Sequence, residues 1–421
     1  MTCIIVGGGS AGFQAAVTCR ALWPDKTVTL IDAENEVGYY RTLLPQFMAG
    51  QLTEDKLFFP YKKDDPLFSI RKGVRAQKLD RNSRSLHLSN GEVLTYDRLI
   101  LAHGGLPYLP DIVSAKSCQG IFPVRDLTTA RATQAWLADH RNVIVVGGSL
   151  VGVKTAVHLC QAGFDVSLIV RRGHVLLRAL SLEAAQIVEE HLQRMGIRIY
   201  FNADLEDIRA AQGAVDAIQA GGQWLSCNAL LVAAGTALDT SFLEGTGLLI
   251  NGRIVVSPAL QTADSRIFAA GDAAVIDWGG NHISPNTWPQ AVSQGRLAAS
   301  NLYREPPVPP TSMSRVNVID LHGLAMVVLG PPVAGAEVIS YSKPEAEMLR
   351  ELFLIDGKPV GGSLIGDISA AGMLHTFINT GRTIGPEEVA FLKPRMRTVI
   401  RFPKHSGQRQ ALILSSKRLT I

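Results

Sequence analysis

Two glycine-rich segments combine the residue types and the spacing that can hold a dinucleotide. The first reads Gly7-Gly-Gly-Ser-Ala-Gly12 and follows the apolar run 2–6 directly. Gly7 permits a tight turn, Gly9 lets the backbone approach a pyrophosphate, and Gly12 allows a helix to pack closely on a strand. Asp32 lies twenty residues after Gly12 and can accept hydrogen bonds from a ribose. We therefore predict a dinucleotide site with its phosphates at a helix start that includes Ser10 and Ala11.

The second segment, Gly147-Gly-Ser-Leu-Val-Gly152, repeats this pattern after the apolar run 142–146 but departs from it in two ways. Ser149 replaces the middle glycine, and Val170 stands where the first segment has Asp32. Arg171 and Arg172 follow. The missing acid removes the acceptor for ribose hydroxyls, whereas adjacent arginines could hold a 2′-phosphate. Three interpretations stay open: a site that tolerates NADPH, a weakened nicotinamide site, and a vestigial site without nicotinamide.

The elements that must position these segments are short apolar strands alternating with helices. We expect strands at 2–6, 28–31, 142–146 and 166–170, a helix at 13–22 and another ending near 159. This alternation predicts an α/β protein with two Rossmann-like dinucleotide-binding units. Two such motifs in one chain suggest two nucleotides that exchange a hydride. We therefore expect FAD in the first site and a nicotinamide, NAD(P)H, as electron donor in the second.

Three further segments carry a resemblance to a known family. They are Tyr96-Asp-Arg-Leu-Ile-Leu-Ala-His-Gly104, Leu230-Leu-Val-Ala-Ala-Gly235 and Ile267-Phe-Ala-Ala-Gly-Asp-Ala273. In this order they resemble the return strands and the late FAD motif of the two-dinucleotide-domain flavoproteins, the glutathione reductase superfamily, over about residues 1–305. The resemblance implies that Asp272 hydrogen-bonds the ribityl chain of FAD. It also implies a helix from Trp288 to about Tyr303 that points its N-terminus at the flavin.

The run Gly38-Tyr-Tyr-Arg-Thr-Leu-Leu-Pro45 is similar to the FAD-binding part of NADH:rubredoxin oxidoreductases and NAD(P)H nitrite reductases. The chain has no cysteine between Cys19 and Cys118, so we expect no thiol–disulfide relay beside the flavin. The relatives commonly have a glutamate near the nicotinamide where this chain has Lys154. Because the cofactor carries the chemistry, no side chain is predicted to be catalytic and no metal is expected.

The predicted cofactor-binding residues come from the two glycine segments and from the resemblance. They are Gly7, Gly9, Ser10, Ala11, Gly12, Asp32, Ala33, Tyr40, Arg41, Leu44, Pro45, Ala76, Ala102, His103, Gly104, Gly147, Ser149, Leu150, Val151, Gly152, Lys154, Arg171, Arg172, Gly235, Gly271, Asp272, Pro289 and Gln290.

The same order of motifs predicts three domains. We expect a discontinuous FAD-binding domain at 1–111 and 239–305, an inserted NAD(P)-binding-like domain at 112–238, and a strand-rich α+β domain at 311–421. The proline-rich stretch 306–310 is the expected boundary. In the last domain we expect strands at 315–321, 325–329, 336–341 and 351–355 and a helix near 370–379.

Composition excludes several classes of protein. With 47% hydrophobic and 19% charged residues the chain is not disordered, and a net charge of +4 is too weak to indicate nucleic acid. No apolar run is long enough to span a membrane, and no secretory leader is expected. The five cysteines form no CxxC pair, which argues against a metal site or a disulfide framework. Reduced thiols are typical of a cytoplasmic protein.

The final stretch, 389–421, contains eight Lys or Arg residues and neither Asp nor Glu. It could be a solvated basic face, a dock for an acidic electron carrier, a subunit contact or a site of adhesion to anionic lipid. We expect an FAD-dependent oxidoreductase, without a redox-active disulfide, that passes electrons from NAD(P)H to a small redox protein or partner subunit. Two alternatives stay open: an FAD-containing electron-transfer or assembly subunit without nicotinamide binding, and a peripheral NADH:quinone reductase. The protein could also assemble as a homo-oligomer.

Overall fold

The chain forms two similar units, and the first is built on a five-stranded parallel sheet in the order β20-β7-β1-β2-β3. In a computed structural model, residues 1–61, 65–284, 286–310 and 316–385 are described. The strands of this sheet are β1 (Thr2–Val6), β2 (Thr27–Ile31), β3 (Phe68–Arg71), β7 (Arg98–Leu101) and β20 (Ile267–Ala269). Strand β20 comes from much later in the chain than the other four. The first unit is therefore completed only after the chain has returned from the second.

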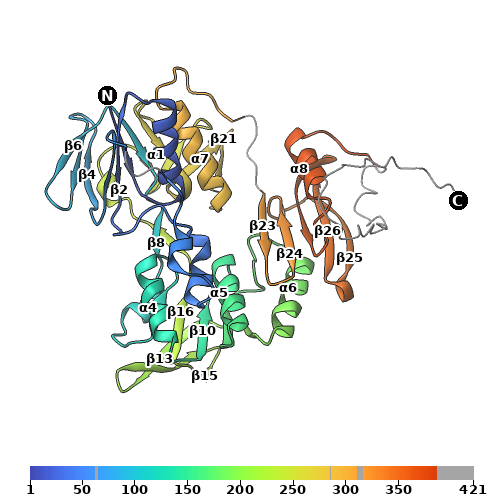
Figure 1. Cartoon of the computed structure of the whole chain (residues 1–421). Helices are drawn as coiled ribbons and strands as arrows, with labels where there is room; N and C mark the ends of the chain where they lie inside the picture. Colours follow the sequence, from blue (N-terminus) through green and yellow to red (C-terminus); the bar gives the residue numbers. More distant parts are fainter. Residues whose placement is uncertain (62–64, 285, 311–315, 386–421) are drawn as a thin grey trace, which may run out of the picture.

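Helices α1 (Ser10–Leu22) and α7 (Trp288–Asn301) lie together against the first sheet (Figure 1). Their backbones touch, because a Cβ on Gly295 would lie 2.1 Å from the carbonyl oxygen of Ala11. Only glycine allows this approach. The contact fixes the start of α7 beside the first glycine loop, the segment Gly7–Gly12.

The second unit is built on another five-stranded parallel sheet, in the order β12-β11-β10-β16-β9. Its strands are β9 (Ile121–Pro123), β10 (Asn142–Val146), β11 (Asp165–Val170), β12 (Arg198–Phe201) and β16 (Ala229–Val232). Helices α4 (Leu127–Leu137), α5 (Leu150–Gln161) and α6 (Leu182–Arg194) belong to the same unit. The central strands of the two sheets, β1 and β10, are mostly apolar and buried, as is usual for strands covered on both faces.

The chain passes between the two sheets through a pair of short antiparallel strands, β8 (Gly105–Pro107) and β17 (Thr236–Leu238). Smaller sheets flank the large ones. They comprise β4 (Ala76–Asp80), β5 (Ser85–Leu88) and β6 (Val93–Thr95); β13 (Leu205–Ala211), β14 (Ala214–Ala220) and β15 (Gln223–Ser226); and β18 (Leu249–Ile250), β19 (Arg253–Val256), β21 (Ala274–Trp278) and β22 (Asn281–Ile283). Short helical turns complete the fold: α2 (Leu44–Met48), α3 (Asp111–Ser114), and 3₁₀ turns at Arg41–Leu43, Glu54–Leu57, Ser241–Leu243, Gly271–Ala273 and Pro344–Ala346.

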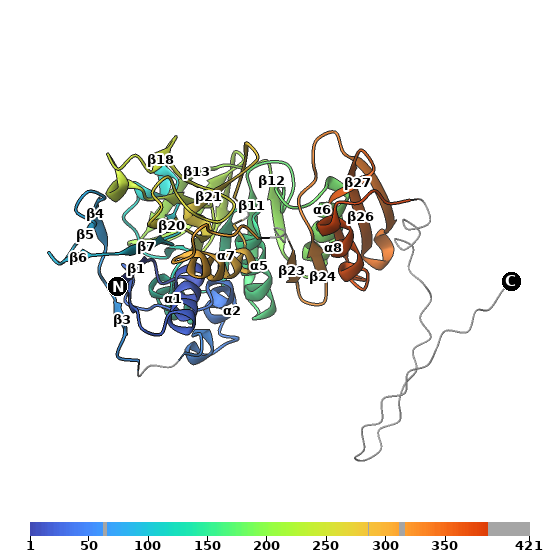
Figure 2. The same cartoon turned by 90° about the horizontal axis from the view of Figure 1, so that it is seen from above.

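The C-terminal sheet has five antiparallel strands in the order β23-β24-β27-β26-β25. They are β23 (Asn317–Asp320), β24 (Ala325–Val328), β25 (Glu337–Lys343), β26 (Met348–Ile355) and β27 (Lys358–Ile365), followed by α8 (Ala371–Thr380). Helix α8 packs on one face of this sheet, and the other face shares a core with α5 and α6 of the second unit (Figures 1 and 2). The predicted α/β class with a strand-rich C-terminal part is confirmed.

The C-terminal sheet contains one strand that the sequence does not predict. No strand is expected at 358–367, yet β27 pairs with both β24 and β26. The basic stretch 389–421 lies outside the described residues.

Candidate functional site

A cavity of about 450 Å³ opens at the carboxyl ends of the strands of the first sheet. This edge is where ligands bind in open α/β sheets. The cavity brings together many of the residues that the sequence predicts for the cofactor. They are Gly7, Gly9, Ser10, Ala11, Asp32, Ala33, Arg41, Ala76, Ala102, His103, Gly104, Val151, Gly271 and Asp272.

The first glycine loop is fixed by two backbone approaches. Gly7 has φ +106°, and a Cβ there would lie 2.3 Å from the Ala102 carbonyl oxygen, while a Cβ on Gly12 would lie 1.8 Å from the Gly7 carbonyl oxygen. Gly9 is the N-cap of α1, and no side chain caps this helix start. The first N–H groups of α1 therefore have no acceptor within the helix. Such a helix start can hold a pyrophosphate.

Asp32 directly follows β2 and ties the loop to the strand. Its Oδ1 accepts a hydrogen bond from the Glu34 amide at 2.8 Å, and its Oδ2 accepts one from the Gly8 amide. Burial raises the pKa of Asp32, and the two amide donors oppose this rise. The carboxylate lines the cavity at the place where a ribose hydroxyl could donate to it.

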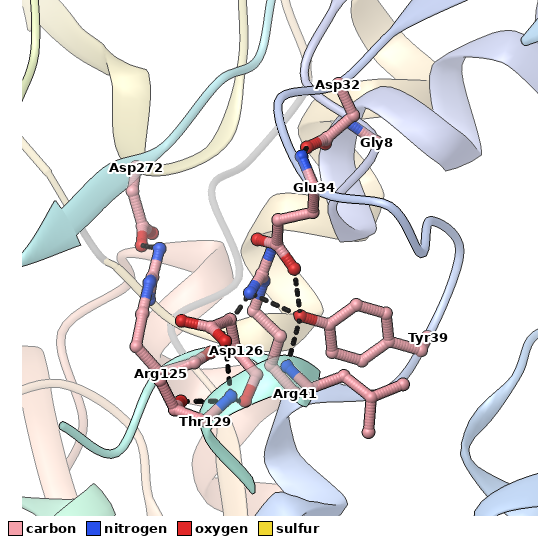
Figure 3. A network of polar contacts seen from close by, with 10 residues as sticks. Gly8, Asp32, Glu34, Tyr39, Arg41, Arg125, Asp126, Thr129 and Asp272 are labelled. Atoms are coloured by element: carbon pink, nitrogen blue, oxygen red, sulfur yellow. Dashed lines mark hydrogen bonds and ion pairs between the residues drawn. The ribbon is translucent and has the colours of Figure 1, made fainter. Parts of the chain in front are cut away.

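Arg41 lies over the first glycine loop, with its Nε 3.9 Å from where a Cβ on Gly9 would be. Its guanidinium pairs with Glu34 Oε1 at 2.5 Å and donates to the Tyr39 hydroxyl at 2.7 Å and to the Arg125 carbonyl at 3.0 Å (Figure 3). Tyr39 is therefore a member of the network and not only a packed side chain. A fixed cation beside an uncapped helix start fits the pyrophosphate of FAD.

Arg125 reaches the same cavity from the second unit. It lies between β9 and α4, and its Nη2 is 3.8 Å from Asp272 Oδ2 (Figure 3). Burial lowers the pKa of Arg125 and Arg41 lowers it further, while Asp272 raises it. The sequence suggested neither Arg125 nor Glu34 as a site residue. Asp126 could have been recognised as the N-cap of α4, since its Oδ1 accepts from the Thr129 amide at 2.8 Å.

His103 lines the cavity between β7 and β8, with its ring edge-on to Phe242 at 5.1 Å. Among the described residues neither ring nitrogen has a hydrogen-bonding partner of good geometry, although the Asp239 backbone and carboxylate lie nearby. Burial lowers the pKa of His103 to about 4, against a smaller opposing effect of Asp239. The imidazole is therefore neutral at pH 7.

The start of α7 forms the far wall of the cavity. Thr287 and Trp288 line it, and the Thr287 hydroxyl is buried without a partner among the described residues. Pro289 occupies the first turn of the helix, as expected, and neither Pro289 nor the buried Gln290 lines the cavity. The unpaired hydroxyl and the dipole of α7 are suited to polar atoms of a flavin.

Several predicted residues lie outside the cavity wall. Tyr40, Leu44 and Pro45 pack beside it, with the Tyr40 ring 5.8 Å from that of Trp288. Gly12 supports the loop from behind. The remainder belong to the second unit: Gly147, Ser149, Leu150, Gly152, Lys154, Arg171, Arg172 and Gly235.

Like Arg125, Val151 belongs to the second unit and lines the cavity. This residue is 46% exposed in the first turn of α5 and lines the same cavity as the first glycine loop. Lys154, one turn further along α5, is half-buried. Burial lowers the pKa of Lys154, and Asp320 of the C-terminal sheet opposes this effect. The acid that faces Lys154 thus comes from the same chain.

The five cysteines, all within the described residues, are free, and none lines the cavity. Three of them, Cys3, Cys19 and Cys227, are buried. Among the described residues no three His, Cys, Asp or Glu side chains group as metal ligands. In the same part of the chain no helix is both long and apolar enough to cross a membrane.

Comparison with known proteins identifies the class to which this fold and cavity belong. Residues 1–295 match the pyridine nucleotide-disulphide oxidoreductase family, and the chain belongs to it. It is an FAD-binding oxidoreductase that acts with pyridine nucleotides.

Individual relatives are similar over most of the chain. An NADH oxidase of Methanocaldococcus jannaschii is 26% identical, with 93% of both chains covered. A rubredoxin-NAD(+) reductase of Pseudomonas putida is 24% identical over 82% of this chain and 93% of its own. The putidaredoxin reductase of a covalent complex with putidaredoxin has the same fold, with a TM-score of 0.85 at 21% identity over 92% of this chain and 95% of its own.

Proposed function

We propose that the protein takes electrons from a reduced nicotinamide dinucleotide and passes them through FAD to a small redox protein. The observation that carries this proposal is the position of Val151. It places the helix start of the second glycine loop against the cavity formed by the first. A nicotinamide that extends from the second loop would therefore meet a flavin held by the first.

When bound, FAD accepts a hydride and gives up electrons, and the chain's own residues bind and orient the two nucleotides. Arg41 and the start of α1 would hold the pyrophosphate, and Asp32 would hold a ribose. The start of α7 would stabilise negative charge at the far end of the cavity. Because no cysteine lines the cavity, no thiol relay intervenes.

The acceptor is proposed from relatives and from charge. The Pseudomonas putida relative is named for rubredoxin, a small redox protein. The eight Lys and Arg residues of 389–421 would favour an acidic carrier. The three-domain division, a cytoplasmic location and a homo-oligomeric assembly remain predictions.

The test is anaerobic mixing of the FAD-loaded protein with NADH and, separately, with NADPH, while the flavin absorbance is followed. We expect at least one nucleotide to reduce the flavin, and we expect a purified acidic rubredoxin or ferredoxin to reoxidise it. If neither nucleotide reduces the flavin, the proposal is wrong.

A second candidate is an electron-transfer subunit that has kept FAD and lost the nicotinamide. Ser149 favours it because it stands where the first loop has Gly9, the residue that lets the backbone approach a pyrophosphate. Lys154 favours it because it places a cation where the family that the chain resembles commonly has a glutamate. A tight partner that co-purifies with the protein, together with a flavin spectrum that neither nucleotide changes, would support this candidate. A Lys154→Glu variant that restores reduction would identify Lys154 as the obstacle.

A further inference from the structure

The second glycine loop has the construction of the first. A Cβ on Gly147 would lie 2.3 Å from the Ala233 carbonyl oxygen, and one on Gly152 would lie 1.9 Å from the Gly147 carbonyl oxygen. The N-cap Ser149 has φ −77° and ψ 171°, close to the −70° and −173° of Gly9. No side chain caps α5 either. The loop therefore keeps an uncapped helix start that can receive a phosphate.

Strand register then shows which residues occupy equivalent places. Val6 pairs with Ile31 in the first unit, and Val146 pairs with Ile169 in the second. The Gly7 amide donates to the Ile31 carbonyl at 2.7 Å, and the Gly147 amide donates to the Ile169 carbonyl at 2.9 Å. The next residues along the chain, Asp32 and Val170, lie against Gly8 and Gly148 of their loops, so Val170 is the counterpart of Asp32.

Val170 changes the chemistry of that place. Its side chain is 2% exposed, with a methyl carbon 3.0 Å from where a Cβ on Gly148 would be. Asp32 instead accepts from the Gly8 amide with its carboxylate. The second site therefore lacks the carboxylate that would accept a ribose 2′-hydroxyl and would repel a 2′-phosphate.

Two cations follow at the places of Ala33 and Glu34, which line the first cavity. Arg171 and Arg172 are both exposed. Arg171 Nε is 3.9 Å from Asp204 Oδ1, in a pair with both side chains at least 65% exposed. Arg172 has no ion pair with any residue that the structure describes. An exposed pair of this kind is weak, so both guanidiniums are available to an anion.

We propose that Arg171 and Arg172 bind the 2′-phosphate of NADPH, and that the protein prefers NADPH to NADH as electron donor. This inference rests on the proposed function for the donor reaction. The phosphate site itself requires only that the adenosine end of the nucleotide binds at the end of β11. Arginine suits such a phosphate because its planar fork can donate two parallel hydrogen bonds.

The experiment has a binding arm and a reduction arm, both with the FAD-loaded protein. Calorimetry compares adenosine 2′,5′-bisphosphate with AMP, and neither probe requires hydride transfer. Anaerobic stopped-flow then compares flavin reduction by NADPH and NADH. We expect the bisphosphate to bind at least about tenfold more tightly and NADPH to be preferred by a similar factor.

Variants locate the effect. Arg172→Ala should weaken bisphosphate binding and slow flavin reduction by NADPH at low concentration, each by about tenfold to a hundredfold. It should leave reduction by NADH within about twofold of wild type. Val170→Asp should lower the NADPH preference further by placing an anion near the phosphate. Arg209→Ala is the matched control, since it removes one exposed cation, paired with Asp216 at 2.9 Å, from β13 of the same unit. It should change neither preference.

The outcomes separate the two proposals. Equal or better reduction by NADH, with no advantage of the bisphosphate, overturns the phosphate site and leaves the proposed function standing. Tight bisphosphate binding without reduction by either nucleotide supports the phosphate site and contradicts the proposed function. If Arg209→Ala loses as much bisphosphate affinity as Arg172→Ala, the probe is held by general charge attraction, and the assignment is overturned.

Discussion

At the scale of single residues, the cavity is organised by Arg41. Its guanidinium joins Glu34, the Tyr39 hydroxyl and the Arg125 carbonyl, so side chains and backbone from both parallel-sheet units hold it in place (Figure 3). Tyr39 also accepts a hydrogen bond from the Leu127 amide at 3.2 Å. A cation that is already fixed loses little entropy when a phosphate binds.

Arg41→Gln should raise the FAD dissociation constant by about tenfold or more, since hydrogen bonds to charged groups contribute about 1.5–3 kcal/mol. Fluorescence titration of the apoprotein with FAD would measure it. Tyr39→Phe keeps the cation, so its effect should be smaller. A dissociation constant for Arg41→Gln within about twofold of wild type would show that Arg41 does not contact FAD.

His103 gives the apoprotein a measurable pH dependence. Its folded pKa of about 4 lies below the unfolded reference of about 6.5. Between these values the unfolded chain binds the extra proton, so stability is present above pH 6.5 and is lost as the pH falls toward 4. We expect His103 to account for a loss of about 2 kcal/mol between about pH 7 and about pH 5.

Urea unfolding of the apoprotein at both pH values tests this, with His103→Phe as the comparison. Burial also lowers the pKa of His158 to about 4, so the variant should keep part of the pH dependence. The predicted quantity is therefore the difference between wild type and variant in the unfolding free energy that each loses from about pH 7 to about pH 5. If wild type and variant lose the same unfolding free energy between these pH values, His103 does not titrate in this way.

At the scale of elements, the two β–loop–α units were predictable because their signals are local. The apolar runs, the glycine spacing and the acid at the end of β2 all lie within about thirty residues of sequence. Strand β27 was missed for the opposite reason. Gly361 and Gly362 suggest a turn, but a Cβ on Gly362 would lie 2.6 Å from the Glu351 carbonyl oxygen. The glycine there serves a close approach to β26, which only the folded sheet reveals.

The first glycine loop gives a matched pair of substitutions. A Cβ on Gly12 would lie 1.8 Å from the Gly7 carbonyl oxygen, so Gly12→Ala should destabilise the protein by about 3 kcal/mol or more. A Cβ on Gly9 meets only Arg41 Nε, at 3.9 Å. Gly9→Ala should therefore fold normally and lose FAD affinity, because the crowding arises only when the pyrophosphate approaches.

Thermal unfolding of both apoproteins, followed by FAD titration of Gly9→Ala, would separate these effects. Normal stability of Gly12→Ala would contradict the backbone approach. Unchanged FAD affinity of Gly9→Ala would mean that the phosphates do not lie over this residue.

At the scale of the whole molecule, the cavity depends on contacts between distant segments. Arg125 reaches Asp272 across 147 positions of sequence, and Val151 reaches the first cavity from the second unit. Neither residue carries a local signal that indicates its neighbour. The sequence therefore predicted the two glycine loops as candidate nucleotide sites, whereas the pairing of the units around one cavity required the structure.

The C-terminal sheet is joined to the second unit by polar contacts around α6 as well as by the shared core. His191 Nδ1 lies 2.7 Å from Glu347 Oε1, and its Nε2 lies 2.7 Å from the Leu321 carbonyl oxygen. The Ser181 hydroxyl caps α6 by accepting from the Ala184 amide at 3.1 Å, and it donates to Glu351 Oε2 at 2.8 Å. Burial raises the pKa of Glu351. These contacts fix the sheet on the helix.

His191→Ala should lower the free energy of unfolding by about 2–4 kcal/mol, because it removes two hydrogen bonds and leaves the Leu321 carbonyl oxygen without its imidazole partner. Arg194 contacts the same Glu347 oxygen at 2.6 Å, but its side chain is 56% exposed. Arg194→Ala should therefore lower stability by less than about 1 kcal/mol. Chemical unfolding of the two variants side by side measures the difference. If both lose the same amount, the His191 imidazole, whose side chain is 12% exposed, contributes no more to stability than the exposed Arg194 guanidinium.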